Sequence, residues 1–475
     1  MPLILGTNSI KDTGYDVANS CRFNDDDEPI LNKSSGTPSS RRIFTFSCWA
    51  KRGNLNPGGS DPNKQLFSIW TDTSNRMDLR FQSGNTIDFY HTSSLGRLTT
   101  NRLFRDPSAW YHVCLRVDTT QATAGNRYRL YVNGTQETSF STETQPSQDS
   151  DLGTNFDNIT VGDDAYGTSH FDGYLAEVCY CDGQSLDPTS FGEFDSDSPT
   201  IWKPIDVSGL TFGTNGFYLD FKDSSNLGND VSGNNNDFTS VNLSATNQST
   251  DTCTNNFATM NPLNVPTSNA PTFTEGALET ESATTSGQRF LGSSTIGVTA
   301  GKWYAECKII VIDSVTVGVS PDVAVHAKDN TYIGSHAHDW SILPDSGNKY
   351  NNDNGTTHGD AFSTNDILMI ALDLDNNNVY FGRNGNWFDG SGNADEAAPN
   401  SALSLTAPAS TPEGAYFFAC SDGGGSAKAK VQWNFGSPPF SISSGNADAN
   451  GHGNFEYSVP SGYFSLCTKN LAENG

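Results

Sequence analysis

Basic residues and long apolar runs are both scarce in this sequence. Its 475 residues include 27 Lys and Arg against 54 Asp and Glu, which gives a formal net charge of −27. A surface that follows nucleic-acid phosphates needs clustered Lys and Arg, and no basic run here is longer than two residues, as at Arg41-Arg42. No stretch approaches the ~18 apolar residues of a membrane-spanning helix. We therefore expect neither nucleic-acid binding nor membrane insertion.

Cysteine is present, but without the pattern of a disulfide or zinc framework. The count of nine is odd, so the cysteines cannot all pair internally. Cys48, Cys114 and Cys420 lie in predicted strands, where a free thiol acts as a small buried apolar group. Cys179 and Cys181 lack the second pair that a zinc site requires. The sequence indicates synthesis in a reducing compartment. No secretory signal is recognisable, so an extracellular role would follow release by lysis.

A sustained helical period is missing too, while turn-forming residues are abundant. Glycine contributes 45 residues, and Asn, Asp, Ser and Thr are frequent. Short segments alternate apolar with polar residues; in 43–50, for example, Phe44, Phe46 and Cys48 share one face. Such strands, spaced ~8–15 residues apart with turn signals between them, predict an all-β fold of antiparallel sandwiches.

One pattern occurs twice. Residues 110–118 form an apolar strand ending in Asp, and 128–134 a second strand ending in Asn-Gly. Residues 367–373 and 379–385 repeat this order with a shorter interval. Asn-Gly tolerates positive φ at both central positions of a type I′ turn, so each copy predicts antiparallel hairpins. We interpret the two copies as core hairpins of two separate sandwiches.

These signals divide the chain into four parts. Residues 1–200 are expected to form the first sandwich and residues 272–440 the second. Between them, 201–271 is rich in Asn, Ser, Asp, Thr and Pro, which favours an extended connector. The last part, 441–475, contains one strand that we expect to dock back on the body.

Two segments resemble known β-sandwich families. Residues 20–195 resemble the laminin-G-like, concanavalin A-type lectin/glucanase sandwich, and residues 300–436 resemble a SPRY domain, itself a bent β-sandwich. The first resemblance rests on residues 44–52, 110–112, 130–134, 159–162 and 171–177, and the second on 301–306, 317–319, 371–375 and 431–435.

The segments outside these two families resemble tailed-bacteriophage virion proteins, often called tail fibre proteins. The resemblance is carried by residues 213–221, 230–238, 255–263 and 460–471. It implies a virion component, assembled in the host cytoplasm with other virion proteins, that attaches to a host-surface glycan or receptor. A homo-oligomer is expected, and a trimer is the usual fibre symmetry. The alternatives are a capsid decoration or head fibre protein without a receptor, and a polysaccharide depolymerase.

Catalytic motifs are lacking. Glucanases of the lectin class need two nearby carboxylates, in the pattern Glu-x-Asp-x-(x)-Glu. The nearest match is Glu193-Phe-Asp195-Ser-Asp197, which lacks the second Glu and lies in a Ser- and Asp-rich loop. We therefore expect no catalytic residues and no enzymatic activity.

Two segments carry candidate metal ligands. Laminin-G-like modules often bind one calcium ion at a loop rim, which points to Asp163 and Asp164 directly after a predicted strand. The alternative is a solvated turn. His336 and His338 alternate, so on a strand both rings would face one way and could share a metal. The alternative there is a polar loop with solvated histidines.

Aromatic residues in predicted loops are candidates for ligand binding. Sugars stack on flat rings and hydrogen-bond to Asp and Asn. Trp340, Tyr350, Asp353 and Trp387 lie between predicted strands of the second sandwich, where recognition usually occurs. The alternative is that Trp340 and Trp387 plug the ends of that sandwich.

Overall fold

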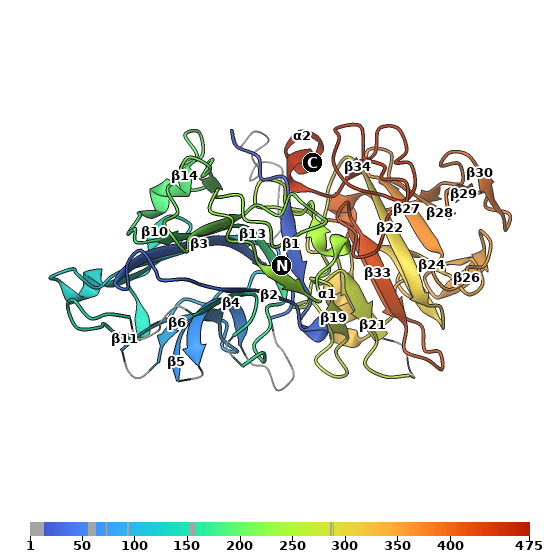
Figure 1. The fold of residues 1–475 in the computed structure, drawn as a ribbon. Helices are drawn as coiled ribbons and strands as arrows, with labels where there is room; N and C mark the ends of the chain where they lie inside the picture. The colour runs from blue at the N-terminus through green and yellow to red at the C-terminus, as the bar shows by residue number, and fades with distance from the viewer. Residues whose placement is uncertain are drawn as a thin grey trace. The chain divides into compact units, whose positions relative to one another are not determined.

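The computed structural model describes residues 14–55, 63–72, 74–92, 95–152, 157–164, 166–285, 287 and 289–475. These residues form two compact units, the first within residues 12–254 and the second within 255–475 (Figure 1). Both are built from sheets whose strands pair antiparallel, as predicted, apart from the parallel pair of β22 (Lys302–Val311) and β34 (Phe464–Ser465) in the second unit. The helices in the described part of the chain are too short and too polar to span a membrane.

The first unit contains two eight-stranded sheets. The first sheet has the order β10-β9-β8-β3-β13-β1-β18, with β16 paired to β13, and the second sheet has the order β11-β7-β6-β5-β4-β12-β2-β17. β14 and β15 form a separate hairpin. The bounds are β1 Ser20–Phe23, β2 Ile30–Ser34, β3 Ile43–Arg52, β4 Lys64–Asp72, β5 Asn75–Phe81, β6 Ile87–His91, β7 Gly96–Thr100, β8 Trp110–Asp118, β9 Tyr128–Val132, β10 Thr135–Gln136, β11 Phe140–Thr144, β12 Asn158–Val161, β13 Gly173–Asp182, β14 Gly192–Phe194, β15 Trp202–Pro204, β16 Phe217–Leu219, β17 Thr239–Val241 and β18 Gln248–Ser249.

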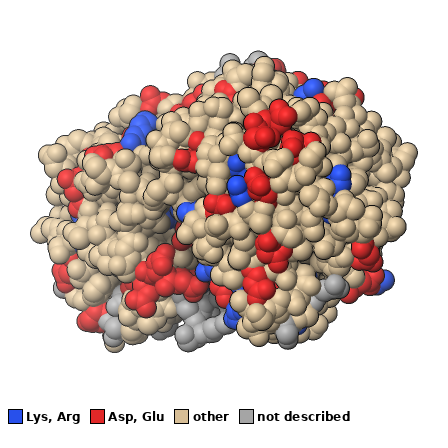
Figure 2. Space-filling view, turned by 90° about the vertical axis from the view of Figure 1, so that its right-hand side faces the viewer, with Lys and Arg blue, Asp and Glu red and all other residues tan. Residues whose placement is uncertain are grey.

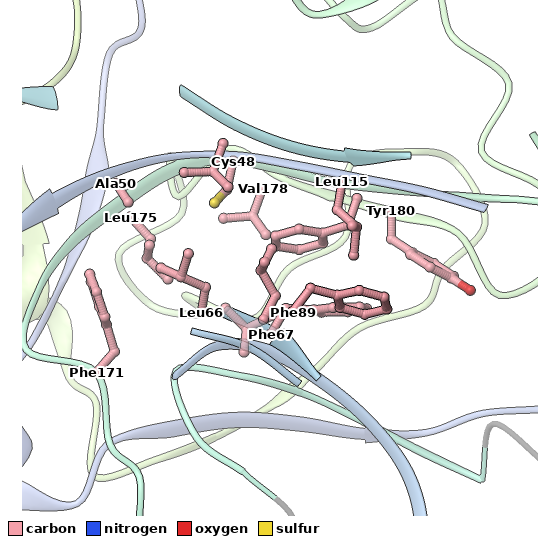
Figure 3. Close-up of a cluster of buried hydrophobic side chains, with 14 of the residues drawn as sticks. Cys48, Ala50, Leu66, Phe67, Phe89, Leu115, Phe171, Leu175, Val178 and Tyr180 are labelled. Carbon is pink, nitrogen blue, oxygen red and sulfur yellow. The ribbon is translucent and has the colours of Figure 1, made fainter. Parts of the chain in front are cut away.

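The inner faces of these two sheets form one apolar core. Strand side chains alternate between faces, so one face of each strand supplies the core. Phe46 of β3 stacks on Phe67 of β4 with ring centroids 4.2 Å apart. Figure 3 shows the same meeting of the sheets, with labelled side chains of β3 and β13 above those of β4 and β6: Cys48, Ala50, Leu175, Leu66, Phe67 and Phe89. The nine cysteines are free, and Cys48, Cys114 and Cys420 are buried, as predicted.

The segment predicted to be an extended connector is divided between the two units. β16 pairs with β13, β17 with β2 and β18 with β1, so residues up to 254 complete the first sandwich. Phe217 and Leu219 of β16 are buried in the first core. Polar side chains replace missing strand pairing: the Asp230 carboxylate accepts hydrogen bonds from the backbone N–H groups of Tyr218, Ser232 and Asn236. This part of the chain is rich in Asn and Asp because its irregular backbone needs such acceptors.

The second unit also pairs two sheets. A ten-stranded sheet has the order β19-β20-β33-β22-β27-β28-β29-β30, with β31 paired to β28 and β34 parallel to β22; a six-stranded sheet has the order β21-β32-β23-β24-β25-β26. The bounds are β19 Thr272–Thr274, β20 Glu279–Glu281, β21 Arg289–Ser293, β22 Lys302–Val311, β23 Val315–Ser320, α1 Val323–Asp329, β24 Trp340–Leu343, β25 Asn348–Asn351, β26 Asn354–Thr357, β27 Ile367–Asp373, β28 Asn378–Arg383, β29 Asn386–Phe388, β30 Ala394–Glu396, β31 Leu403–Ser404, β32 Phe417–Asp422, β33 Lys430–Asn434, β34 Phe464–Ser465 and α2 Thr468–Asn474.

The repeated hairpins lie within the sheets of their units. β8 pairs with β9, and β27 pairs with β28. The Asn-Gly pairs lie at the turns that follow, between β9 and β10 and between β28 and β29, and these strands also pair antiparallel. Asn133 and Gly134 have φ of 49° and 74°, and Asn384 and Gly385 have φ of 49° and 92°. Both Asn-Gly pairs therefore adopt the left-handed conformation that a type I′ turn requires. The prediction of Asn-Gly hairpins is confirmed in both units.

Candidate functional site

Charged and aromatic side chains stand in register on the outer face of the second sheet of the first unit. Across β4 to β7, Trp70 lies opposite Arg76, Asp78 opposite Tyr90, Arg80 opposite Asp88, and Tyr90 opposite Arg97. Their neighbours along each strand, such as Leu79 and Phe89, point the other way into the core. We call this set the arginine face: Trp70, Arg76, Asp78, Arg80, Asp88, Tyr90 and Arg97.

Asp88 binds two of the arginines of the arginine face. Its Oδ2 accepts hydrogen bonds from Arg80 Nε at 3.1 Å and Arg80 Nη2 at 3.0 Å. Its Oδ1 accepts from Arg97 Nε at 2.8 Å and from Thr99 Oγ1 at 2.6 Å. The carboxylate is fully buried. Charge-assisted bonds of this kind fix two guanidinium groups in place and leave the carboxylate with little capacity for chemistry.

Tyr90 lies among three guanidinium groups. The Cζ atoms of Arg76, Arg80 and Arg97 are 5.8, 5.6 and 5.5 Å from the centre of its ring. Cations within about 6 Å of a ring face are attracted to it. The ring therefore helps to hold three like charges together on one sheet. Elsewhere acidic residues outnumber basic ones, and the face drawn in Figure 2 shows more Asp and Glu than Lys and Arg among mostly uncharged residues.

Asp78 and Arg76 extend the network toward one end of the strands. Asp78 is fully buried, accepts a hydrogen bond from Ser68 Oγ at 2.7 Å, and lies 3.1 Å from Arg76 Nη1. Burial raises the pKa of the Asp78 carboxyl above its ordinary value, and the arginines oppose this. Arg76 Nη1 also lies 3.3 Å from Asp164 Oδ2, and its guanidinium lies 4.5 Å from the centre of the Tyr166 ring.

Two hydrogen-bond donors on this face have no acceptor. Trp70 Nε1 and Arg76 Nε are buried and have no partner among the described residues. Buried donors in folded proteins are almost always paired, with protein, water or ligand. Both groups lie on adjacent strands at directly opposed positions. Both atoms are shielded from solvent, so a ligand oxygen would reach them only after the side chains above them move.

The structure places the predicted calcium ligands at the edge of the arginine face. Asp164 is paired with Arg76 and accepts backbone N–H bonds from Tyr166 and Thr168. Asp163 accepts from the Ser169 N–H, and its Oδ1 lies 3.4 Å from His170 Nδ1. Burial raises the pKa of Asp163 to about 6.

These contacts already engage both carboxylates. Among the described residues, neither belongs to a group of three His, Cys, Asp or Glu side chains with ligand atoms within 4.8 Å. The arginine beside Asp164 also opposes cation binding. The residues therefore fit an arginine-paired turn better than a calcium site.

The predicted aromatic residues of the second unit do not form one surface. Trp387 lies in β29 and is 3% exposed, packed with Tyr304 and Phe455, so its ring is not available to a ligand. Trp340 and Tyr350 lie in strands β24 and β25, where Ser341 opposes Tyr350, so Trp340 and Tyr350 point to opposite faces of the sheet.

Only two of the four predicted residues come together. The Tyr350 ring lies 6.2 Å from the Tyr332 ring, and the Tyr332 hydroxyl donates to Asp353 Oδ1 at 2.7 Å. Trp340 instead donates from its Nε1 to the Ser404 carbonyl at 2.8 Å. Trp340 and Trp387 thus act in packing and backbone contacts, the alternative that the sequence left open for both.

The arginine face was not predicted, although the sequence contains a signal for it. Residues 76–80 read Arg-Met-Asp-Leu-Arg, which places three charged side chains on one face of a strand and two apolar ones on the other. Asp88 and Tyr90 alternate in the same way with Ile87 and Phe89. Charged residues at alternate positions of consecutive strands therefore indicate a charged face. The sequence does not give the register between the strands, which decides which charged residues lie opposite one another.

One family model matches the part of the chain that contains the arginine face. Residues 30–183 match the family model of the concanavalin A-like lectin/glucanases superfamily. All the strands of the arginine face lie within that range. No curated protein sequence matches the chain.

Several solved structures are similar to parts of the chain. The SPRY domain of human HERC1 is 16% identical, and the similarity covers 37% of this chain and 96% of that one, with a TM-score of 0.26. The heptameric SAP-like pentraxin of Limulus polyphemus is 16% identical over 36% of this chain and 79% of that one, with a TM-score of 0.27. A human SPRY domain is 16% identical over 33% of this chain and 90% of that one, with a TM-score of 0.24.

Proposed function

We propose that this chain is a non-enzymatic carbohydrate-binding protein that holds a glycan on the arginine face of its first unit. The observation that carries the proposal is the pair of unsatisfied donors, Trp70 Nε1 and Arg76 Nε, beside a ring of guanidinium groups. Sugars offer many oxygen acceptors for such donors, together with apolar C–H faces for aromatic rings. The match of residues 30–183 to a lectin and glucanase superfamily supports the same class of ligand.

The charges of the face favour binding over catalysis. Three arginines face three carboxylates, Asp78, Asp88 and Asp164, so the face is close to neutral. Glycoside hydrolysis needs one carboxyl that gives up a proton and a second that acts as base or nucleophile. Asp88 is held by five hydrogen bonds from Arg80, Arg97 and Thr99 and is not available for either role.

The setting that we propose is the virion of a tailed bacteriophage, as part of a tail fibre or similar appendage. Residues 213–221, 230–238 and 460–471, which resemble segments of such virion proteins, support this setting. Binding would be weak at each site and strong in sum, because many copies on one particle engage one surface. The partners would be other virion proteins and further copies of the chain.

Two substitutions test the glycan site while keeping its shape. Trp70→Phe removes the Nε1 donor but keeps an aromatic ring, and Arg76→Lys removes Nε but keeps the charge. On a glycan array followed by titration calorimetry, we expect the wild-type chain to bind a defined glycan class. Each variant should bind about tenfold more weakly, the effect of one lost hydrogen bond.

Arg42→Ala serves as the matched control. Arg42 also pairs with carboxylates of the first unit, Asp149 and Asp151, but in an exposed position away from the set of residues that defines the arginine face. The Arg42→Ala variant should bind the glycan with wild-type affinity. Equal affinity of wild type, Trp70→Phe and Arg76→Lys for the same glycan would refute the site. Release of reducing ends from the bound glycan would instead identify a depolymerase.

A further inference from the structure

The cations and the carboxylates of the arginine face lie at different depths. The side chains of Asp78 and Asp88 are 0% exposed, whereas that of Arg97 is 35% exposed. The side chains of Arg76 and Arg80 are intermediate, at 13% and 10%. The face is close to neutral as a whole, but its negative charges lie beneath its positive ones. A solute that approaches this part of the sheet therefore meets guanidinium groups before carboxylates.

Arg97 shares its carboxylate with a second arginine. Asp88 lies 2.8 Å from Arg97 Nε and 3.0 Å from Arg80 Nη2, and it is the one carboxylate within 4.0 Å of Arg97 among the described residues. Two guanidinium groups thus divide one negative charge between them. The positive charge at Arg97 is therefore only partly neutralised by the protein.

The carboxylate that balances the total charge of the face lies at its other end. Asp164 is 3.3 Å from Arg76 in β5, and β5 is separated from Arg97 in β7 by the whole of β6. Within the row that crosses these strands, Arg97 lies opposite Tyr90, and Tyr90 lies opposite the buried Asp78. The excess positive charge is therefore located around Arg97 and Tyr90.

Arg97 also keeps donors that Asp88 does not use. A guanidinium carries five N–H groups in a planar fork and can bind carboxylates along more than one edge. Arg97 binds Asp88 through Nε and Nη2. Nη1 takes no part in these bonds, so Nη1 and the second N–H of Nη2 form a free outer edge. Arginine binds planar carboxylates in bidentate fashion along such an edge.

Hydroxyl groups suited to a sugar lie next to Arg97 on the edge strand β11. Thr144 lies opposite Arg97, Thr142 lies opposite Thr99, and both residues of β11 are exposed. Their hydroxyls can donate and accept hydrogen bonds, as sugar hydroxyls do. Glu143 lies between them in sequence, so its side chain points to the opposite face of the strand. The surroundings of Arg97 on this face are thus polar and positively charged.

We propose that the arginine face selects an acidic glycan, whose sugar carboxylate pairs with the outer edge of Arg97 while its ring lies beside Tyr90 and the threonines of β11. This inference rests on the proposed glycan site and adds the class of sugar, which is a hexuronic or sialic acid and not a neutral hexose. The chain has a net charge of −27, so the attraction comes from contact with Arg97 and not from long-range steering.

The first test compares acidic glycans with their neutral counterparts on the full chain. An array carries oligosaccharides of galacturonic, glucuronic and sialic acid, each beside its carboxyl-reduced form, together with neutral glucose and mannose oligosaccharides. We expect the glycans that bind to be acidic. Reduction of the carboxyl group should weaken binding about tenfold or more, the effect of losing a hydrogen bond between charged groups. This comparison changes the ligand alone, so the folding of a variant does not enter.

The second test changes Arg97 and uses an equally exposed arginine as the control. Arg97→Gln removes the guanidinium and should weaken binding of the acidic oligosaccharide about tenfold or more in titration calorimetry. Arg42→Gln makes the same substitution at a side chain that is 40% exposed and pairs with Asp149 and Asp151, outside the arginine face. The Arg42→Gln variant should bind with wild-type affinity.

The outcomes separate this inference from the proposed function. Binding of neutral glycans that is weakened by Trp70→Phe would keep the glycan site and overturn its acidic specificity. Equal binding of an acidic glycan and its carboxyl-reduced form, or wild-type affinity in Arg97→Gln, would overturn that specificity as well. Absence of binding to every member of the array would overturn the proposed function and this inference together.

Discussion

The Lys51 ammonium and the Asp251 carboxylate form an ion pair of 2.6 Å inside the first unit, with side chains 0% and 1% exposed. Lys51 belongs to the central strand β3, and Asp251 follows β18 near the end of the unit. Asp251 also accepts a hydrogen bond from Trp110 Nε1 at 3.1 Å. The pair therefore ties the last segment of the unit to its first sheet across 200 residues of sequence.

Asp251→Ala should strongly destabilise the first unit. It removes the carboxylate that pairs with the buried Lys51 ammonium, and burial already lowers the pKa of Lys51. Removing one member of a buried pair typically costs about 3–5 kcal/mol. Urea denaturation of the full chain, followed by tryptophan fluorescence, should show the loss in the transition of the first unit alone.

A double variant separates the effect of the lost ion pair from other effects of the substitution. Lys51→Met with Asp251→Leu replaces both charges by apolar groups, and such replacements are often close to neutral. The double variant should recover most of the stability lost in Asp251→Ala. If it is as unstable as the single variant, loss of the Asp251 carboxylate beside the Lys51 charge is not the cause.

The boundary of the first unit predicts how short the chain can be made before this unit no longer folds. A chain ending at residue 254 retains β16, β17, β18 and Asp251, whereas a chain ending at residue 200 loses all of them. The shorter chain exposes the core that Phe217 and Leu219 cover. We expect cooperative thermal unfolding of the longer chain and aggregation of the shorter one. Equal melting behaviour of the two chains would contradict the boundary at residue 254.

The second unit contains a buried carboxyl that should make its stability depend on pH. Glu306 accepts hydrogen bonds from the backbone N–H groups of Tyr457 and Glu456, at 2.8 and 3.0 Å, and from the Tyr304 hydroxyl at 3.0 Å. It thereby holds the segment after β33 against β22. Burial nevertheless raises the pKa of Glu306 to about 7, because desolvation of the charge outweighs these donors.

The direction of the pH effect follows from this raised pKa. Between the unfolded pKa, about 4.3 for Glu, and the folded value of about 7, the folded state keeps a proton that the unfolded state loses. The free energy of unfolding of the second unit should therefore fall as pH rises from about 4.5 to about 7, by about 3 kcal/mol at most. Calorimetric melts across this range measure the slope.

Glu306→Gln is the matched variant for that measurement. It cannot lose a proton, so the slope between about pH 4.5 and 7 should flatten. At pH 5 the folded Glu306 is protonated, and both of its oxygens can still accept the backbone N–H bonds, whereas the Gln amide has a single oxygen acceptor, so the variant should be less stable at pH 5. An unchanged slope in Glu306→Gln would show that another group titrates in this range.

The strands and turns of the fold could be read from the sequence because their causes are local. The Asn133-Gly134 and Asn384-Gly385 turns need only positive φ at adjacent residues, and the alternation of β5 shows which face is buried. The segment after residue 200 was harder to interpret. Its Asn and Asp residues suggest an extended chain, but their side chains accept backbone hydrogen bonds that hold Phe217 against the first core.

Sites depend on register and burial, which composition does not reveal. Trp387 looks like a loop residue because β29 has only three residues, yet the ring packs against Tyr304. Asp164 looks like a calcium ligand until Arg76, 88 residues away in sequence, is seen beside it. His336 and His338 were recognised as a pair, but the Asp322 carboxylate, 16 residues before His338 and 3.4 Å from a nitrogen of each ring, could not be linked to them from the sequence.

The position of Tyr90 leads to the last prediction, which concerns the ring itself. Three guanidinium groups lie within 6 Å of its centre. Tyr90→Leu keeps an apolar side chain but removes the attraction of the ring for cations, worth roughly 0.5–1 kcal/mol per pair. Without it, Arg76 and Arg97 repel one another and turn toward solvent. Glycan binding should weaken roughly tenfold, as measured by titration calorimetry.

Tyr90→Phe is the control, because it retains the ring and loses only the hydroxyl. It should bind the glycan nearly as well as the wild type. Affinity lost equally in the two variants would mean that the hydroxyl, and not the ring, is what the ligand contacts. Affinity retained in both would mean that the arginines are held by Asp78 and Asp88 alone, since these carboxylates pair with all three guanidinium groups independently of the ring.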